Sequence, residues 1–263
     1  MLYFIPYNGN FGDQLNIYLI DKLIKILNLD IYINFINLAT TQKYDKTLKT
    51  FSFLGSIMHL LPSNIDVIGT GVNPNYNNIS PSLNIISLRG ELSKNYLINE
   101  KNYKIDNIIL GDPALLIPRL FSEWVEPLPI CNNCEIGFIP HFNDIEHVNK
   151  HRYLFKKLNI EIYYPNQELL NVINFIRSKK TIISSSLHGI IVSEMLNKDV
   201  NWIMYNESLK SESELKYLEY FNSTGRINIK YVTEINQALT STIPKPIYDD
   251  TELFNLLVNY FME

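Results

Sequence analysis

The chain lacks both an excess of positive charge and a long hydrophobic run. Its 263 residues carry 23 Lys and Arg against 27 Asp and Glu, for a formal net charge of -4. A nucleic-acid partner is therefore not expected, because binding to its backbone relies on clustered Lys and Arg. No apolar run approaches the roughly 18 residues that a membrane-spanning helix needs, and the start, "MLYFIPYNGNFGD", has no basic segment of a signal peptide. We expect a cytoplasmic protein that can still contact the inner face of a membrane.

Cysteine is also scarce. The two cysteines, Cys131 and Cys134, form the sequence "CNNC". Such a pair can be redox-active or supply half of a zinc site. No second cysteine pair and no His pair at ligand spacing accompanies it. We interpret the pair as two thiols in a linker, and we predict no metal site.

Short apolar runs alternate with helical patterns in the first half of the chain. The spacing predicts helices over 14–27, with Asp13 as N-cap, and over 91–99. The predicted strands are 2–6, 31–36, 65–72, 84–90 and 107–113. The stretch 117–134 contains three prolines and no clear period, so it is predicted to be a linker.

The alternation then starts again. The predicted strands of the second half are 135–141, 160–165, 180–185 and 200–205, and its predicted helices are 144–158, 167–178 and 189–196, with two or three more at the end. This order favours an α/β fold with parallel sheets. We expect two Rossmann-like domains, residues 1–120 and 135–263, joined by a linker over 121–134, and a last helix that packs back on the first domain.

Unusual residues of the first half follow its predicted strands. Asn10, Gly12 and Asp13 come after the first strand, Arg89 after "NIISL", and Asp112 after "NIIL". Open parallel sheets bind ligands at the carboxyl ends of their strands, so these residues are candidates for a site. The alternatives are structural: glycine in a turn with Asp13 as a helix cap, an arginine on the surface, and Asp112 in a tight turn.

Two histidines of the second half are placed in the same way. His141 follows "GFIP", and His188 lies in "TIISSSLHGIIVSEML". A helix that begins near Gly189 would present free N–H groups and a positive dipole end, which stabilise an anion. Ser185 and Ser186 would add hydroxyl donors there, and Gly189 would allow close approach. The alternatives are a packed edge residue for His141 and a capped helix start for His188.

Several segments together resemble the polysaccharide pyruvyl transferase family. They cover residues 8 to about 196 in the family's order. The matching segments are "GNFGDQLN", "FLGSIMHLL" followed by "VIGTGV", "ISLRGELSKNYL", "LGDPALLIP", "GFIPH" and "ISSSLHGIIVSEML".

The resemblance implies two Rossmann-like domains that face each other across a cleft, as in glycosyltransferases of the B type. It implies an enzyme that transfers the enolpyruvyl group of phosphoenolpyruvate to two hydroxyls of a sugar, with a pyruvate ketal and phosphate as products. The sugar would belong to a glycan repeat unit on a lipid carrier for capsule or exopolysaccharide. The N-terminal domain would bind the acceptor and the C-terminal domain the donor, without a cofactor or metal.

The resemblance also assigns residues. The family's histidine corresponds to His188, and its "R-x-x-x-S" segment corresponds to Arg89 and Ser93. Some members carry Arg two places before the histidine, where this chain has Ser186. His141 or the helix N-terminus would then have to supply the missing positive charge.

The chemistry of this reaction fits the candidates. The donor carries a phosphate and a carboxylate, which Arg89 can bind in bidentate fashion, with Ser185, Ser186, Gly189 and His141 around it. The expected acid or base is His188, because its ordinary pKa lies nearest neutrality.

On the sugar side, Asp13 or Asp112 would serve as the base, and Asn10 and Gly12 would join Asp13 in binding the acceptor. Two rival interpretations remain at this point: a nucleotide-sugar glycosyltransferase of the same architecture, and a binding protein without catalysis. A serine hydrolase is disfavoured because "SSSLHG" is not G-x-S-x-G.

Overall fold

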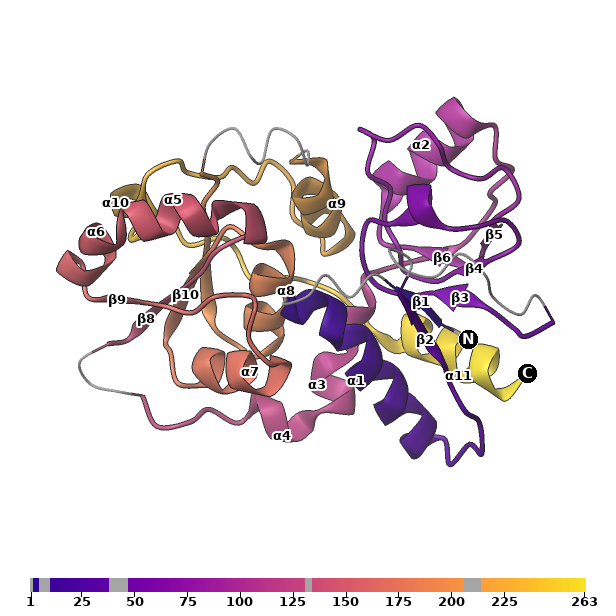
Figure 1. Ribbon diagram of the computed structural model, residues 1–263, viewed down its shortest axis with the longest axis horizontal. Helices are drawn as coiled ribbons and strands as arrows, with labels where there is room; N and C mark the ends of the chain where they lie inside the picture. The colour runs from indigo at the N-terminus through magenta and orange to yellow at the C-terminus, as the bar shows by residue number, and fades with distance from the viewer. Residues whose placement is uncertain (1, 5–9, 38–46, 131–133, 206–213) are drawn as a thin grey trace.

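The computed structural model describes residues 2–4, 10–37, 47–130, 134–205 and 214–263. Figure 1 shows two groups of sheets side by side, with the strands of the N-terminal half on the right and the strands of the C-terminal half on the left. All strand pairs within the sheets of the described chain are parallel. The α/β class with parallel sheets is therefore confirmed.

The N-terminal half contains a five-stranded sheet in the order β2-β1-β3-β4-β5 and a separate pair, β6-β7. An isolated bridge from Thr70 to Leu88 connects the two sheets. Its elements are β1 (Leu2–Phe4), α1 (Phe11–Ile26), β2 (Phe35–Asn37), β3 (Phe51–Ser52), η1 (Met58–Leu60), β4 (Asp66–Val67), β5 (Asn84–Ile85), β6 (Ser87–Leu88), α2 (Glu91–Lys101), β7 (Ile109–Leu110), η2 (Pro113–Leu116), α3 (Ile117–Leu120) and α4 (Ser122–Val125).

The C-terminal half contains a four-stranded sheet in the order β11-β10-β8-β9. Its elements are β8 (Ile136–Ile139), η3 (Phe142–Asp144), α5 (Ile145–Lys150), α6 (Arg152–Lys157), β9 (Ile160–Ile162), α7 (Leu169–Arg177), β10 (Thr181–Ser184), α8 (Leu187–Met195), β11 (Asp199–Trp202), α9 (Leu215–Ser223), α10 (Ile235–Ala238) and α11 (Thr251–Met262).

Apolar periodicity explains why these segments fold as they do. Helix α7 buries Leu169, Val172, Ile173 and Ile176, which recur at the spacing of one helix face. Strand β10 is buried along most of its length, as expected of a central parallel strand that is covered on both faces.

Asparagine takes the place of glycine after several helices. Asn28, Asn102, Asn159 and Asn197 all have φ between 51° and 63°. This left-handed backbone lets a helix end, and asparagine tolerates it better than most residues with a Cβ.

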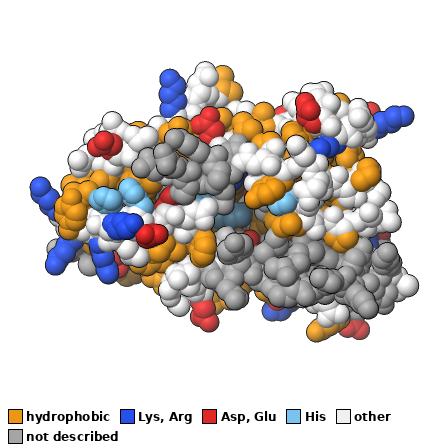
Figure 2. All heavy atoms as spheres, turned by 45° about the horizontal axis from the view of Figure 1, so that its top comes forward, with side chains coloured by type: hydrophobic (Ala, Val, Ile, Leu, Met, Phe, Trp, Pro, Cys, Tyr) orange, Lys and Arg blue, Asp and Glu red, His pale blue; other side chains and the backbone are white. Residues whose placement is uncertain are grey.

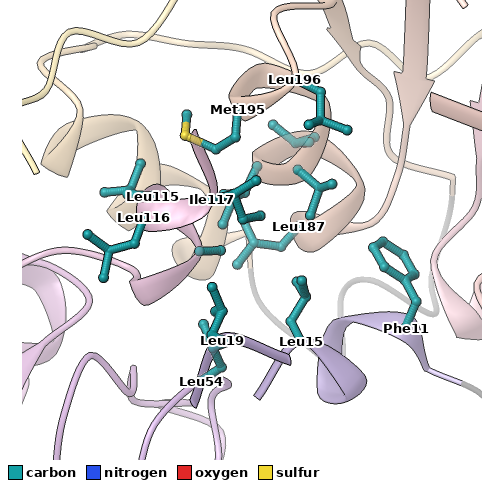
Figure 3. Packing of buried hydrophobic residues seen from close by; sticks show 14 of the residues in the cluster. Phe11, Leu15, Leu19, Leu54, Leu115, Leu116, Ile117, Leu187, Met195 and Leu196 are labelled. Carbon is teal, nitrogen blue, oxygen red and sulfur yellow. The ribbon is translucent and has the colours of Figure 1, made fainter. Parts of the chain in front are cut away.

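The largest hydrophobic core runs through both halves. It contains Phe51 and Ile68 beside the first sheet together with Ile139 and Ile182 beside the second. Figure 3 shows side chains of α1, η2 and α8 packed together, including Leu19, Leu116 and Leu187. Helix α1 therefore packs against elements of the C-terminal half, although it follows the first strand of the N-terminal half.

The last helix, α11, lies against the first sheet (Figure 1). The hydroxyl of Tyr260 donates to a carboxylate oxygen of Asp66 in β4 at 2.7 Å. The rings of Tyr260 and Phe261 both pack edge-on against Phe51 in β3. The chain end thus covers a face of the N-terminal sheet.

Three predictions of local structure were wrong. The stretch 117–134 contains the helices α3 and α4, whose Leu120 and Trp124 are buried in the core, so its first part is not a free linker. Helix α1 begins at Phe11 rather than at residue 14. Helix α8 begins at Leu187 rather than at Gly189. Cys131 and its neighbours to 133 lie outside the described residues, and Cys134 is a free thiol.

Candidate active site

A cavity of about 590 Å³ lies where the two halves meet. Figure 2 shows one face of the molecule, with histidine side chains near its middle. The residues that line the cavity are Asn10, Asp13, Gly55, Ser56, Ile57, His59, Leu60, Asn73, Tyr76, Asn78, Arg89, His141, Phe142, Asn143, Pro165, Ser186, Leu187, His188 and Lys216. Asp13, Arg89, His141 and His188 of the sequence candidates thus share one cavity.

The start of α8 presents His188 to the cavity. Ser186 is the N-cap, and its Oγ accepts a hydrogen bond from the N–H of Gly189. His188 therefore lies in the first turn of the helix, beside its positive end. Its Nε2 atom is buried and has no hydrogen-bond partner within the described part of the chain. A buried ring nitrogen of this kind is suited to a ligand or a transferred proton.

The two serines before Ser186 hold the turn together. Ser184 donates to the carbonyl of Ile139 at 2.8 Å and accepts from the N–H of Ser186 at 3.0 Å. Ser185 donates to Asp144 at 2.6 Å and accepts from the N–H of His141 at 2.8 Å. Ser185 is fully buried and does not line the cavity.

Gly189 has the same supporting role. It does not line the cavity, and a Cβ at its position would collide with Ser184. The missing Cβ of Gly189 therefore lets α8 lie close to Ser184 in β10. Neither Gly189 nor Ser185 is placed to contact a ligand in the cavity.

Helix α1 begins at the same cavity. Asn10, rather than Asp13 as the sequence predicted, is its N-cap, with a 3.0 Å hydrogen bond from the N–H of Gly12. Asp13 lines the cavity from the first turn. A Cβ at Gly12 would collide with the ring of His188, so this glycine allows the imidazole to lie against α1. Gly12 therefore positions a candidate catalytic group instead of contacting the cavity.

Arg89 reaches the cavity from the end of β6 but is 1% exposed, so the surface alternative was wrong. Its Nε donates to Glu219 of α9 at 2.8 Å, and its Nη1 donates to Ser56 at 2.8 Å. Gly71 leaves room for the guanidinium, which a Cβ there would strike. Nη2 lies 2.7 Å from the same oxygen of Glu219 as an ion pair, but it has no hydrogen bond of its own within the described part of the chain.

Ser93, the serine of the "R-x-x-x-S" segment, belongs to the same cluster. Its N–H donates to Glu219 at 2.7 Å, and its Oγ accepts from the N–H of Val72 at 2.7 Å. Ser93 is buried and serves to fix the start of α2.

His141 and Lys216 form another wall. Nδ1 of His141 accepts a hydrogen bond from the N–H of Asn143 at 3.2 Å. Its Nε2 lies 3.3 Å from Nζ of Lys216, the second residue of α9. His141 is therefore an edge residue that also borders the cavity.

Asp112 has a different environment. Its Oδ1 caps η2 by accepting from the N–H of Ala114 at 3.0 Å, and the residue is fully buried and does not line the cavity. Burial raises the pKa of Asp112 to about 6, although the positive charge of Arg89 acts in the opposite direction. The geometry thus favours the turn interpretation over contact with a sugar.

The electrostatics of the cavity act most strongly on His188. Burial lowers its pKa to about 3, and the charges of Arg89, Lys216 and His141 add to that effect. The free protein therefore holds His188 as a neutral imidazole near pH 7, and an anion in the cavity would offset those charges and raise its pKa.

A model of the polysaccharide pyruvyl transferase family matches residues 10–207. The chain belongs to this family. The match includes both helix starts at the cavity, and it ends before Lys216 and Glu219.

Two similar proteins carry no assigned activity. An uncharacterised protein of Acanthamoeba polyphaga mimivirus, L143, is 27% identical over 226 residues, which cover 85% of this chain and 73% of the relative. The crystal structure of a functionally uncharacterised protein from Klebsiella pneumoniae subsp. pneumoniae superimposes with a TM-score of 0.51 at 14% identity, over 89% of this chain and 92% of the other. At this identity, the structural likeness concerns the fold alone.

Sequence reasoning missed one wall of this cavity. His59 and Tyr76 stack with ring centroids 4.0 Å apart and planes at 7°. Asn78 donates to the carbonyl of His59 at 3.0 Å, and Asn73 lines the cavity next to them. No strand-end pattern marks these residues, which come from loops and from η1. The only signal for this wall in the sequence is the group of aromatic and amide residues in the loops between the predicted strands.

The described residues contain no group of three or more His, Cys, Asp or Glu that is arranged to hold a metal ion. None of their helices is long and apolar enough to span a membrane.

Proposed function

We propose that this pyruvyl transferase family member transfers the enolpyruvyl group of phosphoenolpyruvate to two hydroxyls of a sugar in a surface-polysaccharide precursor. Family membership supports pyruvyl transfer to a polysaccharide. The observation that carries the donor assignment is the set of Arg89, Lys216, His141 and His188 around one cavity that also receives the start of α8. A phosphate and a carboxylate are the ligands that such an environment favours.

The reaction balances without an oxidant or reductant. One sugar hydroxyl adds to C2 of the enolpyruvyl group, and a proton is added to its methylene carbon, which becomes a methyl group. The second hydroxyl then forms the other C2–O bond as the C2–O bond to phosphate breaks. One hydroxyl proton has gone to the methyl group and the other leaves with hydrogen phosphate. The product is a cyclic pyruvate ketal.

His188 and Asp13 would carry the proton transfers. The negative charges of bound phosphoenolpyruvate would offset the positive charges of Arg89 and Lys216, which lower the pKa of His188 in the free protein. The pKa of His188 would therefore rise, and its imidazolium could protonate the methylene carbon. Asp13, which borders the cavity from α1, would accept the proton of the attacking hydroxyl.

The wall of the cavity that the N-terminal half contributes suits the sugar acceptor. The stacked rings of His59 and Tyr76 offer a flat surface to the apolar face of a sugar, and Asn10, Asn73 and Asn78 offer amide groups for its hydroxyls. We therefore assign the acceptor to the N-terminal half, residues 1–120, and the donor to residues 135–263, in an arrangement like that of B-type glycosyltransferases. The acceptor would be a glycan repeat unit on a lipid carrier, used at the inner face of the membrane.

The proposed scheme uses no cofactor or metal. The N–H groups at the start of α8 and the side chain of Lys216, which borders the cavity, would meet the negative charges of the donor, together with Arg89 where its ion pair with Glu219 leaves it accessible.

The test is turnover. The purified protein is incubated with phosphoenolpyruvate and a panel of oligosaccharides that contain galactose, mannose, glucose or N-acetylhexosamines, in the presence of a chelator. Phosphorus NMR follows phosphate release, and mass spectrometry follows an acceptor that gains one pyruvate less one water. Phosphate release that requires an acceptor and yields this product supports the proposal.

The rival functions give other results. Transfer of a sugar from a nucleotide sugar, with no reaction of phosphoenolpyruvate, would assign a glycosyltransferase. Binding of phosphoenolpyruvate without turnover across the whole panel would favour a binding protein. Activity lost on chelation and restored only by a divalent ion would contradict the metal-free scheme.

A further inference from the structure

Glu219 is a buried acid that the proposed reaction does not use, and it comes from a part of the chain that the family match does not reach. It lies on α9, which packs against α2 of the N-terminal half. Its side chain does not line the cavity, but it contacts one that does, the guanidinium of Arg89. An effect of Glu219 on a ligand in the cavity is therefore expected to pass through Arg89.

The contacts of Arg89 separate the two ends of its guanidinium. Nε donates to Oε2 of Glu219 at 2.8 Å, and Nη2 lies 2.7 Å from the same oxygen. Nη1, at the other end, donates to the hydroxyl of Ser56 at 2.8 Å. Ser56 lines the cavity, so the Nη1 end of the guanidinium is the one that borders it. Glu219 thus holds Arg89 by the end that lies away from Ser56.

This arrangement leaves N–H groups of Arg89 for a ligand. A guanidinium has five N–H donors. The hydrogen bonds to Glu219 and Ser56 use two of them, and Nη2 is buried without a hydrogen bond of its own within the described part of the chain. Nη1 and Nη2 together form an edge that can bind a carboxylate or a phosphate in bidentate fashion.

Glu219 is itself fixed by both of its oxygens. Oε1 accepts the N–H of Ser93 at 2.7 Å, at the start of α2, while Oε2 faces Arg89. Backbone packs closely on both side chains: a Cβ at Gly90 would lie 2.6 Å from Cγ of Glu219, and a Cβ at Gly71 would lie 2.1 Å from Nη2 of Arg89. The ion pair is therefore held in one orientation.

We propose that Glu219 is a positioning residue for the donor, which orients Arg89 so that its Nη1–Nη2 edge meets an anionic group in the cavity. A long arginine side chain has many rotamers, and this freedom would otherwise be lost when the ligand binds. The ion pair removes it when the chain folds, although it also balances part of the guanidinium charge. The identity of the donor rests on the proposed function, but the effect of Glu219 on anion binding does not depend on turnover.

The test measures the Kd for phosphoenolpyruvate by calorimetry, without an acceptor, in the wild type and in Glu219→Asp. Aspartate keeps the charge but is one methylene shorter, so it cannot hold Ser93 and Arg89 at their present distances. We expect the Kd to rise roughly tenfold, because a misoriented guanidinium loses directed hydrogen bonds. The matched control is Glu194→Asp: Glu194 forms a buried ion pair with Arg226, neither residue lines the cavity, and the Kd should not change.

A double variant separates positioning from a general loss of structure. Arg89→Lys alone should raise the Kd, because the planar guanidinium is lost. Adding Glu219→Asp to Arg89→Lys should then change the Kd by less than about twofold, because no guanidinium is left to orient. Two effects that multiply in full would show that Glu219 acts independently of Arg89, and the proposal would be overturned. An unchanged Kd in Glu219→Asp alone would overturn it as well.

Nitrogen NMR of the arginine side chains tests the proposal in the wild type and decides it should Glu219→Asp not fold. The Nε–H signal of Arg89 is assigned by its absence in Arg89→Lys. When phosphoenolpyruvate binds, this N–H should keep its slow exchange with solvent, because the contact with Glu219 persists, and the Nη signals should shift. Fast exchange of the Nε–H in the complex would show that the ligand displaces Glu219, which contradicts a positioning role.

The outcome for Glu219 is separate from the outcome for the reaction. Donor binding that depends on Glu219, without pyruvyl transfer by the wild type, would leave the positioning role standing and refute the proposed function alone. A wild type that binds inorganic phosphate but not phosphoenolpyruvate would refute the proposed donor, and the same variants are then compared with phosphate. Binding of neither anion would overturn both proposals.

Discussion

Glu219 of α9 and Arg89 at the end of β6 form a buried ion pair between the two halves of the chain. Nε and Nη2 of Arg89 lie 2.8 and 2.7 Å from the same oxygen of Glu219, and the side chains are 1% and 2% exposed. The other oxygen of Glu219 accepts the N–H of Ser93 at the start of α2. A Cβ at Gly90 would collide with Glu219, so the backbone leaves room for the carboxylate. The pair fixes α9, and with it Lys216, relative to the N-terminal half.

Breaking this pair should destabilise the protein strongly. Glu219→Gln leaves the guanidinium of Arg89 buried without its counter-charge, and we expect the free energy of unfolding to fall by about 3–5 kcal/mol. Urea unfolding followed by circular dichroism measures this change. The double variant Arg89→Met with Glu219→Leu should recover most of the loss, because no buried charge remains unpaired.

The exposed pair Lys150 and Glu146 is the control, since Glu146→Gln should change the free energy of unfolding by less than about 1 kcal/mol. An equally small loss in Glu219→Gln would show that the pair does not hold the halves together.

His188→Gln should lower kcat at least about 100-fold while phosphoenolpyruvate still binds. Glutamine keeps a hydrogen-bond donor but cannot titrate, and general acid–base groups typically contribute about 10²–10⁴-fold to the rate.

Ser186→Ala, which removes the cap of α8, should act mainly on the Kd of the donor. Ser185→Ala is expected to act mainly on stability, because its hydroxyl joins Asp144 to the backbone of His141 inside the protein.

Calorimetry gives a second readout for His188. Donor binding should be accompanied by proton uptake near pH 7 in the wild type, because the anion raises a pKa that is about 3 in the free protein. The uptake appears as a binding enthalpy that depends on the ionisation enthalpy of the buffer, and it should be absent in His188→Gln. Near wild-type kcat in that variant, with only Kd raised, would make His188 an anion-binding residue and direct the search for the acid to His141 or Asp13.

The pH dependence of stability should show two opposing terms. His188 has a folded-state pKa of about 3, below its ordinary value of 6.5, so the unfolded chain takes up a proton first and stability falls as pH falls from 6.5 toward 3. Asp112 has a folded-state pKa of about 6, above its ordinary value of 3.8, so the folded chain takes up a proton first and stability rises as pH falls from 6 to 3.8. The two terms cancel in part between about pH 4 and 6.

Asp112→Asn separates them. The amide keeps an oxygen to cap η2 but cannot titrate. As the pH is lowered from 6 to 4, the free energy of unfolding should therefore fall more steeply in the variant than in the wild type. The two slopes should differ by up to about 1.4 kcal/mol per pH unit. Thermal or urea unfolding at closely spaced pH values measures the slopes. Asp106→Asn, at an exposed position, should keep the wild-type slope. Identical slopes in Asp112→Asn and the wild type would contradict the raised pKa of Asp112.

The sequence alone determined the α/β class and grouped several residues that line the candidate site. Alternating strand and helix patterns imply parallel strands, and the carboxyl ends of parallel strands share one edge. For that reason the sequence groups Asp13, Arg89, His141 and His188 at one edge, and in the structure they line one cavity. Helix starts were placed less well, because several adjacent polar residues can serve as the cap, and Asn10 and Ser186 were the ones used.

Only the tertiary structure decided how those residues act. The sequence predicts a ligand-binding arginine at Arg89, but in the structure its guanidinium forms a buried ion pair with Glu219, 130 residues later. Gly12 proved to make room for the ring of His188. Lys216 enters the cavity from a helix without any recognisable motif. Contacts of this kind depend on how two separately formed sheets pack around a shared core, and local patterns of 2 or 3.6 residues carry no information about that packing.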